Sequence, residues 1–78
     1  MILKVLSPEK ELLSIEDAVS VELPGTQGRF VVLKGHAPLV TSLEKGFVRY
    51  RSGGKPSELE IDGGFAEVLN DTITVCAA

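Results

Sequence analysis

The chain has 78 residues and a formal net charge of −3 at pH 7, with 44% hydrophobic and 24% charged residues. This length allows one small domain, and the composition is too apolar for a disordered tail. The excess of acidic residues argues against a protein that binds nucleic acid through its phosphates. A single cysteine, Cys76, excludes an internal disulfide, and no apolar run approaches the ~20 residues of a membrane-spanning helix.

The first segment, "MILKVLSPEKE", has neither the basic and apolar regions of a secretory leader nor the Arg- and Ser-rich pattern of a transit peptide. We therefore expect an untargeted, cytoplasmic start. The overlapping stretch "SPEKELLSIEDA" is the only one with a helix-like pattern, with Ser7 as candidate N-cap and Pro8 as candidate first helical residue. The stretch is short, so extended structure is the favoured alternative.

Hydrophobic and polar residues alternate in four later segments, at residues 17–25, 46–54, 57–64 and 70–78. A period of two turns one face of a strand inward and leaves the other in contact with solvent. The residues predicted to point inward are Val19, Val21, Leu23, Val48, Tyr50, Leu59, Ile61, Ile73 and Val75.

Glycine, proline, asparagine and aspartate separate these segments at short intervals. Asn70-Asp71 predicts a two-residue hairpin turn, because both residues tolerate positive φ. The stretch "RSGGKPSE" predicts a longer hairpin loop, and Pro56 within it is incompatible with a central strand. Gly63-Gly64 indicates a tight bend or a close backbone approach. The whole pattern predicts an all-β fold, a small antiparallel β-sandwich or flattened barrel.

His36, in "KGHAPL", is the only histidine, and its candidate roles are general base, metal ligand and partner contact. A metal site needs several spaced ligands, and nucleophilic catalysis needs a base beside a nucleophile. Phosphate-loop and dinucleotide motifs are absent. Glu58, Glu60 and Asp62 are interpreted as a solvated strand face. We expect no catalysis by this chain alone, no metal and no cofactor, so His36 is interpreted as a turn or interface residue.

Two other functions stay open. Flattened β-barrels of this size bear lipoyl or biotinyl groups on a lysine at a hairpin tip, and Lys45 lies mid-chain between two apolar runs. The sequence Glu44-Lys45-Gly46 differs from the Asp-Lys-Ala or Met-Lys-Met of those domains, so a modified Lys45 is the less favoured alternative. The other open function is a stand-alone barrel that binds a ligand or nucleic acid. For stacking on bases or ligands, the chain offers only Tyr50 and three phenylalanines.

The segments "VLSPEKEL", "VELPGTQGRF", "KGHAPLVTSLEKGFVR" and "IDGGFAEVLNDTITV" resemble the ε subunit of the F-type ATP synthase, and they span nearly the whole chain. The Gly-His-Ala-Pro-Leu run is the most specific part. The resemblance implies a single N-terminal β-sandwich domain over residues 1–78, with about ten short strands and little or no helix. Most family members continue into a C-terminal helical hairpin that can inhibit ATP hydrolysis. Here the sequence stops at the last strand without the hairpin, as either a natural short form or a truncated chain. For a natural short form, we expect inhibition by this route to be absent.

The resemblance implies a non-catalytic subunit of the central stalk, or rotor. It links the γ subunit to the c ring and couples proton translocation to ATP synthesis, with no nucleic acid and no small-molecule substrate of its own. The missing transit peptide favours a peripheral location on the cytoplasmic side of the bacterial inner membrane; a plastid-encoded subunit, which would also lack a transit peptide, is the alternative. Such a role requires adhesion, and one sheet of a sandwich can provide an apolar binding patch.

The resemblance also assigns residues to the interface with γ. It implies that Ser7 and His36 contact γ. The residues that follow the histidine, Ala37, Pro38 and Leu39, are expected to shape the loop and its apolar side.

A second set of residues is assigned to the c ring. The resemblance implies that the turn at Gln27, Gly28 and Arg29 meets the polar loops of the ring, with Phe30 beside it. Arg29 stands where family members often have an acidic residue, and Val31 where they often have glycine. We therefore expect Arg29 to pair with a carboxylate on the ring.

Overall fold

The computed structural model describes residues 1–78 and contains nine strands and no helix. No segment of it can therefore cross a membrane as a helix. The strands are β1 (Ile2–Leu6), β2 (Glu11–Ile15), β3 (Ala18–Gly25), β4 (Gly28–Leu33), β5 (Leu39–Leu43), β6 (Gly46–Ser52), β7 (Lys55–Ile61), β8 (Gly64–Leu69) and β9 (Thr72–Ala77).

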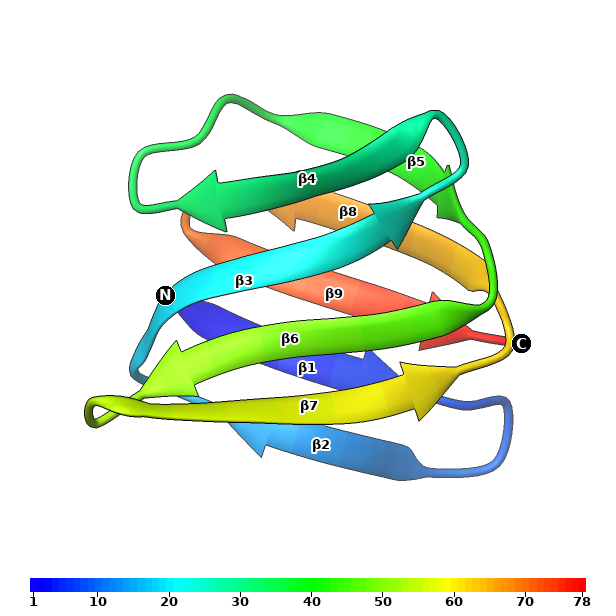
Figure 1. The fold of residues 1–78 in the computed structure, drawn as a ribbon, viewed down its shortest axis with the longest axis horizontal. Coiled ribbons are helices and arrows are strands. Elements are labelled where there is room, and N and C mark those ends of the chain that lie inside the picture. Colours follow the sequence, from blue (N-terminus) through cyan, green and yellow to red (C-terminus); the bar gives the residue numbers. More distant parts are fainter.

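The strands form one sheet that folds over on itself into two facing layers (Figure 1). The front sheet has the order β4-β3-β6-β7, and the back sheet has the order β5-β8-β9-β1-β2. A single residue pair, Gly25 with Leu43, joins β3 to β5 and so connects the layers. All pairs are antiparallel except β1 with β9. The predicted small β-sandwich is confirmed, with nine strands and one parallel pair.

The core lies between the two layers and consists of hydrophobic residues only. Alternation along each strand explains its membership, because residues two apart share a face. The predictions for Val21, Leu23, Val48, Ile61, Ile73 and Val75 are confirmed, since each of these residues is buried. Tyr50 and Leu59 are half-buried and pack against this core from the end of β6 and from β7.

Val19 is the exception to the predicted alternation, because its side chain is 64% exposed. In the ladder between β3 and β6, Ala18 pairs with Ser52 and Ser20 pairs with Arg51, so Val19 has no partner. Such an extra residue is a β-bulge, which shifts the alternation by one position. Ala18 therefore takes the inward position that the sequence pattern had assigned to Val19.

The segment with the helix-like pattern is extended, so the helical interpretation is wrong. The chain reverses direction after β1, where Ser7 N donates to Lys10 O at 2.8 Å. Ser7 Oγ accepts from Lys10 N at 3.1 Å and so fixes the same turn. Pairing with β1 then holds Glu11–Ile15 as an edge strand. Ser7 stabilises this turn and does not act as a helix N-cap, because the residues that follow the turn pair with β1.

The turn predictions have mixed outcomes. Asn70 and Asp71 have φ values of 51° and 57° and form the predicted two-residue turn between β8 and β9. The predicted longer loop at "RSGGKPSE" is wrong, because Ser52 pairs with Lys55 and leaves only two glycines in the turn. Two glycines adopt positive φ without strain, which allows the shorter connection. Pro56 lies in β7, at the edge of the sheet, as predicted.

Gly63 and Gly64 form the close backbone approach that the sequence indicated. Their φ values are 130° and 132°, in a region that favours glycine. A methyl group at Gly64 would overlap the carbonyl group of Cys76 on β9. The glycine pair therefore allows β8 to start directly against the end of β9.

Candidate protein interaction surfaces

The loops of the sandwich gather at two ends (Figure 1). We call one of them the turn end; it contains the β3–β4 turn at residues 26–27, the loop at residues 7–10 and the C-terminus. We call the other the loop end; it contains the β4–β5 loop at residues 34–38, the β8–β9 turn and the N-terminus. The residues predicted to contact γ and the c ring are divided between these two ends.

The β3–β4 turn presents the residues predicted to contact the c ring. Gln27, Gly28 and Arg29 are exposed, whereas Phe30 is half-buried and packs against the core. Gly25 pairs with Gly28 at the base of the turn, and the two backbones are so close that a methyl group at Gly25 would lie 2.8 Å from Gly28 O. The turn is therefore a tight projection whose tip is polar.

Arg29 has its polar contacts within the chain. Its Nη2 donates to the carbonyl oxygen of Phe47 at 2.7 Å, and its Nε lies 3.3 Å from Glu22 Oε2. Pro24, its partner on β3, has no N–H with which to extend the β3–β6 ladder beyond Glu22. The guanidinium supplies a donor to β6 at this place and links β4 to β6 across β3. The resemblance implies an ion pair between Arg29 and a carboxylate on the c ring. The contacts of Arg29 within the chain are a role that the resemblance did not predict.

The β4–β5 loop holds His36, Ala37, Pro38 and the approach to Leu39. His36 N donates to Leu33 O at 3.1 Å, and the imidazole Nδ1 lies 2.7 Å from Ala37 O. His36 is half-buried, Ala37 and Pro38 are exposed, and Leu39 begins β5 and packs against the core. The structure contains no group of three or more histidine, cysteine or carboxylate side chains that could hold a metal ion, at His36 or elsewhere.

Ser7 lies at the turn end, far from His36 at the loop end (Figure 1). The structure therefore separates the two residues predicted to contact γ by the length of the sandwich. Both nevertheless adjoin the back sheet, because Ser7 follows β1 and the loop of His36 precedes β5. The back sheet is thus the sheet that both residues adjoin, and a partner that lies along it could contact both.

The outer face of the back sheet exposes apolar side chains that the list of predicted site residues did not contain. Phe65 is 62% exposed and Val40 is 71% exposed. Phe65 pairs with Cys76 on β9, and Cys76 pairs with Leu6 on β1, so the three form a row across the sheet. We call Val40, Phe65, Cys76 and Leu6, with Leu69 at the end of β8, the apolar face.

The sequence contained a clue to the apolar face. In "GFAEVL", Phe65 and Leu69 stand at the positions that alternate with the buried Ala66 and Val68. Glu67 lies between them on the same outward face, beside Val40, so this face of the strand is only partly apolar. Exposed apolar side chains that are grouped on one surface are typical of interaction sites. The structure thus supplies candidate residues for the apolar patch that was predicted on one sheet, and the patch itself stays a prediction.

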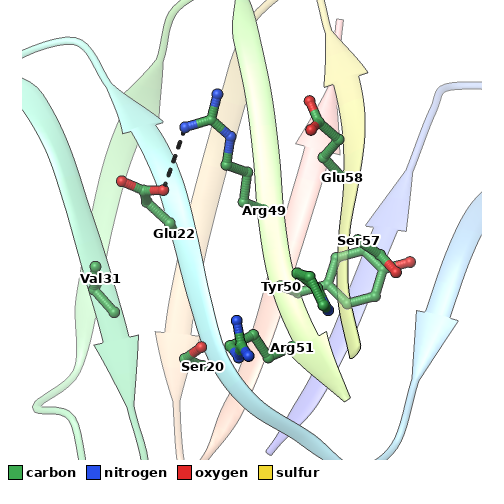
Figure 2. Close-up of a pocket in the computed structure, with 9 residues that line it drawn as sticks. Ser20, Glu22, Val31, Arg49, Tyr50, Arg51, Ser57 and Glu58 are labelled. Atoms are coloured by element: carbon green, nitrogen blue, oxygen red, sulfur yellow. Dashed lines mark ion pairs between the residues drawn. The ribbon is translucent and has the colours of Figure 1, made fainter. Parts of the chain in front are cut away.

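The outer face of the front sheet exposes Val19, Val31 and Leu33 and also carries charged residues. A hollow of about 480 Å³ lies on this face, and Arg49 Nη1 is 3.7 Å from Glu22 Oε1 within it. Figure 2 shows Arg49 facing Glu22. Arg51 and Glu58 also line it. Two arginines are thus matched by two glutamates, so the hollow has no excess of positive charge to attract a nucleic-acid backbone. This charge balance counts against the stand-alone nucleic-acid-binding barrel that the sequence left open.

Lys45 is exposed between β5 and β6. These strands do not pair with each other, since β5 pairs with β8 and β3 whereas β6 pairs with β3 and β7. Lys45 therefore lies on a crossover between the two layers and not at a hairpin tip. This placement removes the structural basis of the carrier-domain alternative.

Comparison with known proteins identifies the family. Residues 1–78 match the family described as "ATP synthase, Delta/Epsilon chain, beta-sandwich domain". The ATP synthase epsilon chain of Desulfitobacterium hafniense is 43% identical over 75 residues, which are 96% of this chain and 56% of that protein. The epsilon chain of Magnetococcus marinus is 44% identical over 73 residues, which are 94% of this chain and 53% of that protein. The chain thus spans about half the length of these relatives.

Solved structures have the same fold. A chain in the mitochondrial ATP synthase of Euglena gracilis, an assembly of OSCP, F1 and c-ring, has a TM-score of 0.90 at 26% identity over 99% of this chain and 49% of its own length. A chain from the central stalk and c-ring of the Tetrahymena thermophila enzyme has a TM-score of 0.81 at 16% identity over 99% of this chain and 62% of its own, a likeness of fold alone. The chain belongs to the β-sandwich domain family of ATP synthase delta and epsilon chains.

Proposed function

We propose that the chain is a non-catalytic domain of the ATP synthase rotor. It links a γ-type shaft subunit to the ring of c subunits and so helps to couple proton translocation to ATP synthesis. The observation that carries this proposal is the apolar face of the back sheet, to which Phe65 contributes the largest exposed side chain. Family membership and the epsilon-chain names of the relatives support it.

The γ-type partner lies along the back sheet in this proposal. Such a partner covers the apolar face and reaches Ser7 at one end and His36 at the other, because both adjoin the sheet. Strands of five or six residues are roughly 17–20 Å long, which is within the reach of a single protein surface. The position of the two residues at opposite ends is thus compatible with one partner.

Burial of the apolar face provides the adhesion. Covering a side chain such as Phe65 contributes about 1.5–3 kcal/mol, and Val40 and Leu69 add to this. Residues of this kind at the centre of an interface often dominate its binding energy. We therefore expect the affinity for the shaft to depend mainly on this face, and the residues at the two ends to orient the partner.

The c ring meets the turn end in this proposal. Thr26 and Gln27 form the exposed polar tip of the β3–β4 turn, and Gly28 pairs with Gly25 at its base. The Arg29 guanidinium holds the base of the turn through Phe47 O and Glu22, so the tip and not this guanidinium contacts the ring. The domain is then peripheral to the membrane, on the cytoplasmic side of a bacterial inner membrane.

Binding to a core complex tests the proposal. The chain is titrated onto purified bacterial ATP synthase stripped of its own epsilon chain, and the γ and c subunits that bind with it are identified. Phe65→Lys is expected to weaken binding at least about tenfold, because it places a charge in an apolar contact. Val19→Lys is the matched control, since Val19 is 64% exposed on the front sheet.

Equal effects of the two variants would contradict the placement of the shaft on the back sheet. Failure of the unaltered chain to bind the core complex, or to bring down γ and c subunits, would contradict the proposed function itself.

A further inference from the structure

One hydrogen bond joins the β4–β5 loop to a distant part of the chain. Gly35 N donates to Asp71 Oδ1 at 2.7 Å, across a separation of 36 residues. The other hydrogen bonds of residues 34–38 are local, from His36 N to Leu33 O and between His36 Nδ1 and Ala37 O. The Asp71 carboxylate is therefore the only hydrogen-bonding group outside this neighbourhood that holds the loop.

Asp71 is itself held in place by the fold. It occupies the β8–β9 turn with a φ of 57°, and its carbonyl oxygen accepts from Ile2 N at 3.0 Å. Its main chain thus contacts β1 while its side chain contacts Gly35. A carboxylate on so well defined a turn can place a loop accurately, because its own backbone has little freedom.

The residue type at position 71 also indicates a role for the side chain. Two-residue turns of this kind have positive φ at both positions, and glycine is the residue that accepts this conformation with least strain. An aspartate here is the more strained choice, whereas its carboxylate provides a charge-assisted acceptor for a backbone N–H. Gly35, the donor, has a φ of 81° and is also in the conformation that favours glycine.

We propose that Asp71 is a positioning residue for the His36 interface. Its carboxylate fixes the backbone at Gly35 and thereby sets where His36 and the start of β5 are presented to the γ-type partner. This inference rests on the proposed function, because it concerns the partner that His36 contacts. It adds a residue that acts through Gly35, in a turn that sequence motifs assign to hairpin formation only.

The test uses three variants of one turn. Asp71→Gly removes the acceptor and retains a residue that suits positive φ. Asp71→Asn retains an acceptor oxygen without the charge. Asn70→Gly is the matched control, because position 70 has a φ of 51° and its side chain makes no hydrogen bond to the loop.

Two measurements separate positioning from a structural role. The amide resonance of Gly35 in a ¹H–¹⁵N spectrum reports the hydrogen bond directly, and titration onto the epsilon-depleted core complex reports affinity. For Asp71→Gly we expect a large shift and faster exchange of the Gly35 amide, a thermal midpoint close to the native value, and an affinity reduced roughly tenfold. For Asp71→Asn we expect a Gly35 amide shift and an affinity between those of the native chain and those of Asp71→Gly. Asn70→Gly should match the native chain in both measurements.

The outcomes distinguish this inference from the function on which it rests. An unchanged affinity of Asp71→Gly, alongside a weakened His36→Ala variant, overturns the positioning role and leaves the proposed function in place. An equal loss of affinity in Asn70→Gly also overturns it, because the turn and not the carboxylate is then responsible. Failure of the unaltered chain to bind overturns the proposed function, and it does so independently of residue 71.

Discussion

The two connections at either end of β4 are held in different ways. The β3–β4 turn is two residues long, its strands pair up to Gly25 and Gly28, and Arg29 links its base to β6. The β4–β5 loop has no ladder, and one carboxylate, that of Asp71, holds it from outside. Variants around the turn should therefore change the stability of the fold, whereas variants of the loop should change binding more than stability.

The largest effect is expected at Gly64, which lies beside the junction of the layers at the turn end. Gly64→Ala should lower the free energy of unfolding by at least about 3 kcal/mol, because the methyl group meets the Cys76 carbonyl and φ is 132°. Urea denaturation measures this change. Gly54→Ala is the control, since Gly54 has a φ of 78° but open space around it, and should cost only about 1 kcal/mol. Equal costs would mean that the backbone approach at Gly64 is not limiting.

A smaller effect is expected at Arg29. Arg29→Gln should lower the free energy of unfolding by about 1 kcal/mol, because it removes the donor to Phe47 O and the partly exposed ion pair with Glu22. The matched control is Arg51→Gln, since Arg51 is exposed on β6 and takes part in neither ion pair. Denaturation of both variants at low and high salt checks the prediction. If the two variants are equally stable, the link from β4 to β6 contributes nothing.

The smallest effect on stability is expected in the loop. His36→Ala should change the free energy of unfolding by less than about 0.5 kcal/mol, because the only hydrogen bond of the imidazole is to the neighbouring Ala37 carbonyl. Its affinity for the epsilon-depleted core complex should nevertheless fall roughly fivefold, as for a contact residue at the rim of an interface. Thermal unfolding and titration provide the two values. A destabilised His36→Ala variant with native affinity would reverse the proposed contrast between the turn and the loop.

The strands were largely predictable because their information is local. Val21, Val48 and Ile73 alternate with polar residues, and alternation alone identifies the face that a strand buries. Val19 was assigned to the wrong face because a bulge depends on which residues of β6 lie opposite, and no pattern within β3 contains that information. The segment at residues 11–15 became a strand for the same reason, since β1 supplies its partner.

The candidate surfaces were predictable only in part. The position of His36 between Gly35 and Pro38, together with the absence of a second ligand or nucleophile, indicated a contact residue. The contact from Gly35 to Asp71 spans 36 residues, and that from Arg29 to Phe47 spans 18, so neither follows from spacing. The apolar face had a local clue in "GFAEVL", but its extent across β5, β8, β9 and β1 depends on strand order.

The sequence by itself determined the all-β class, most of the residues of the core, the β8–β9 turn and the family, because each follows from side-chain periodicity, turn chemistry or an ordered set of motifs. Only the tertiary structure decided that Ser7 and His36 lie at opposite ends, that Arg29 is engaged with β6, and that Asp71 holds the loop of His36. The physical reason is that strand pairing brings together residues distant in the chain, and their hydrogen bonds depend on register.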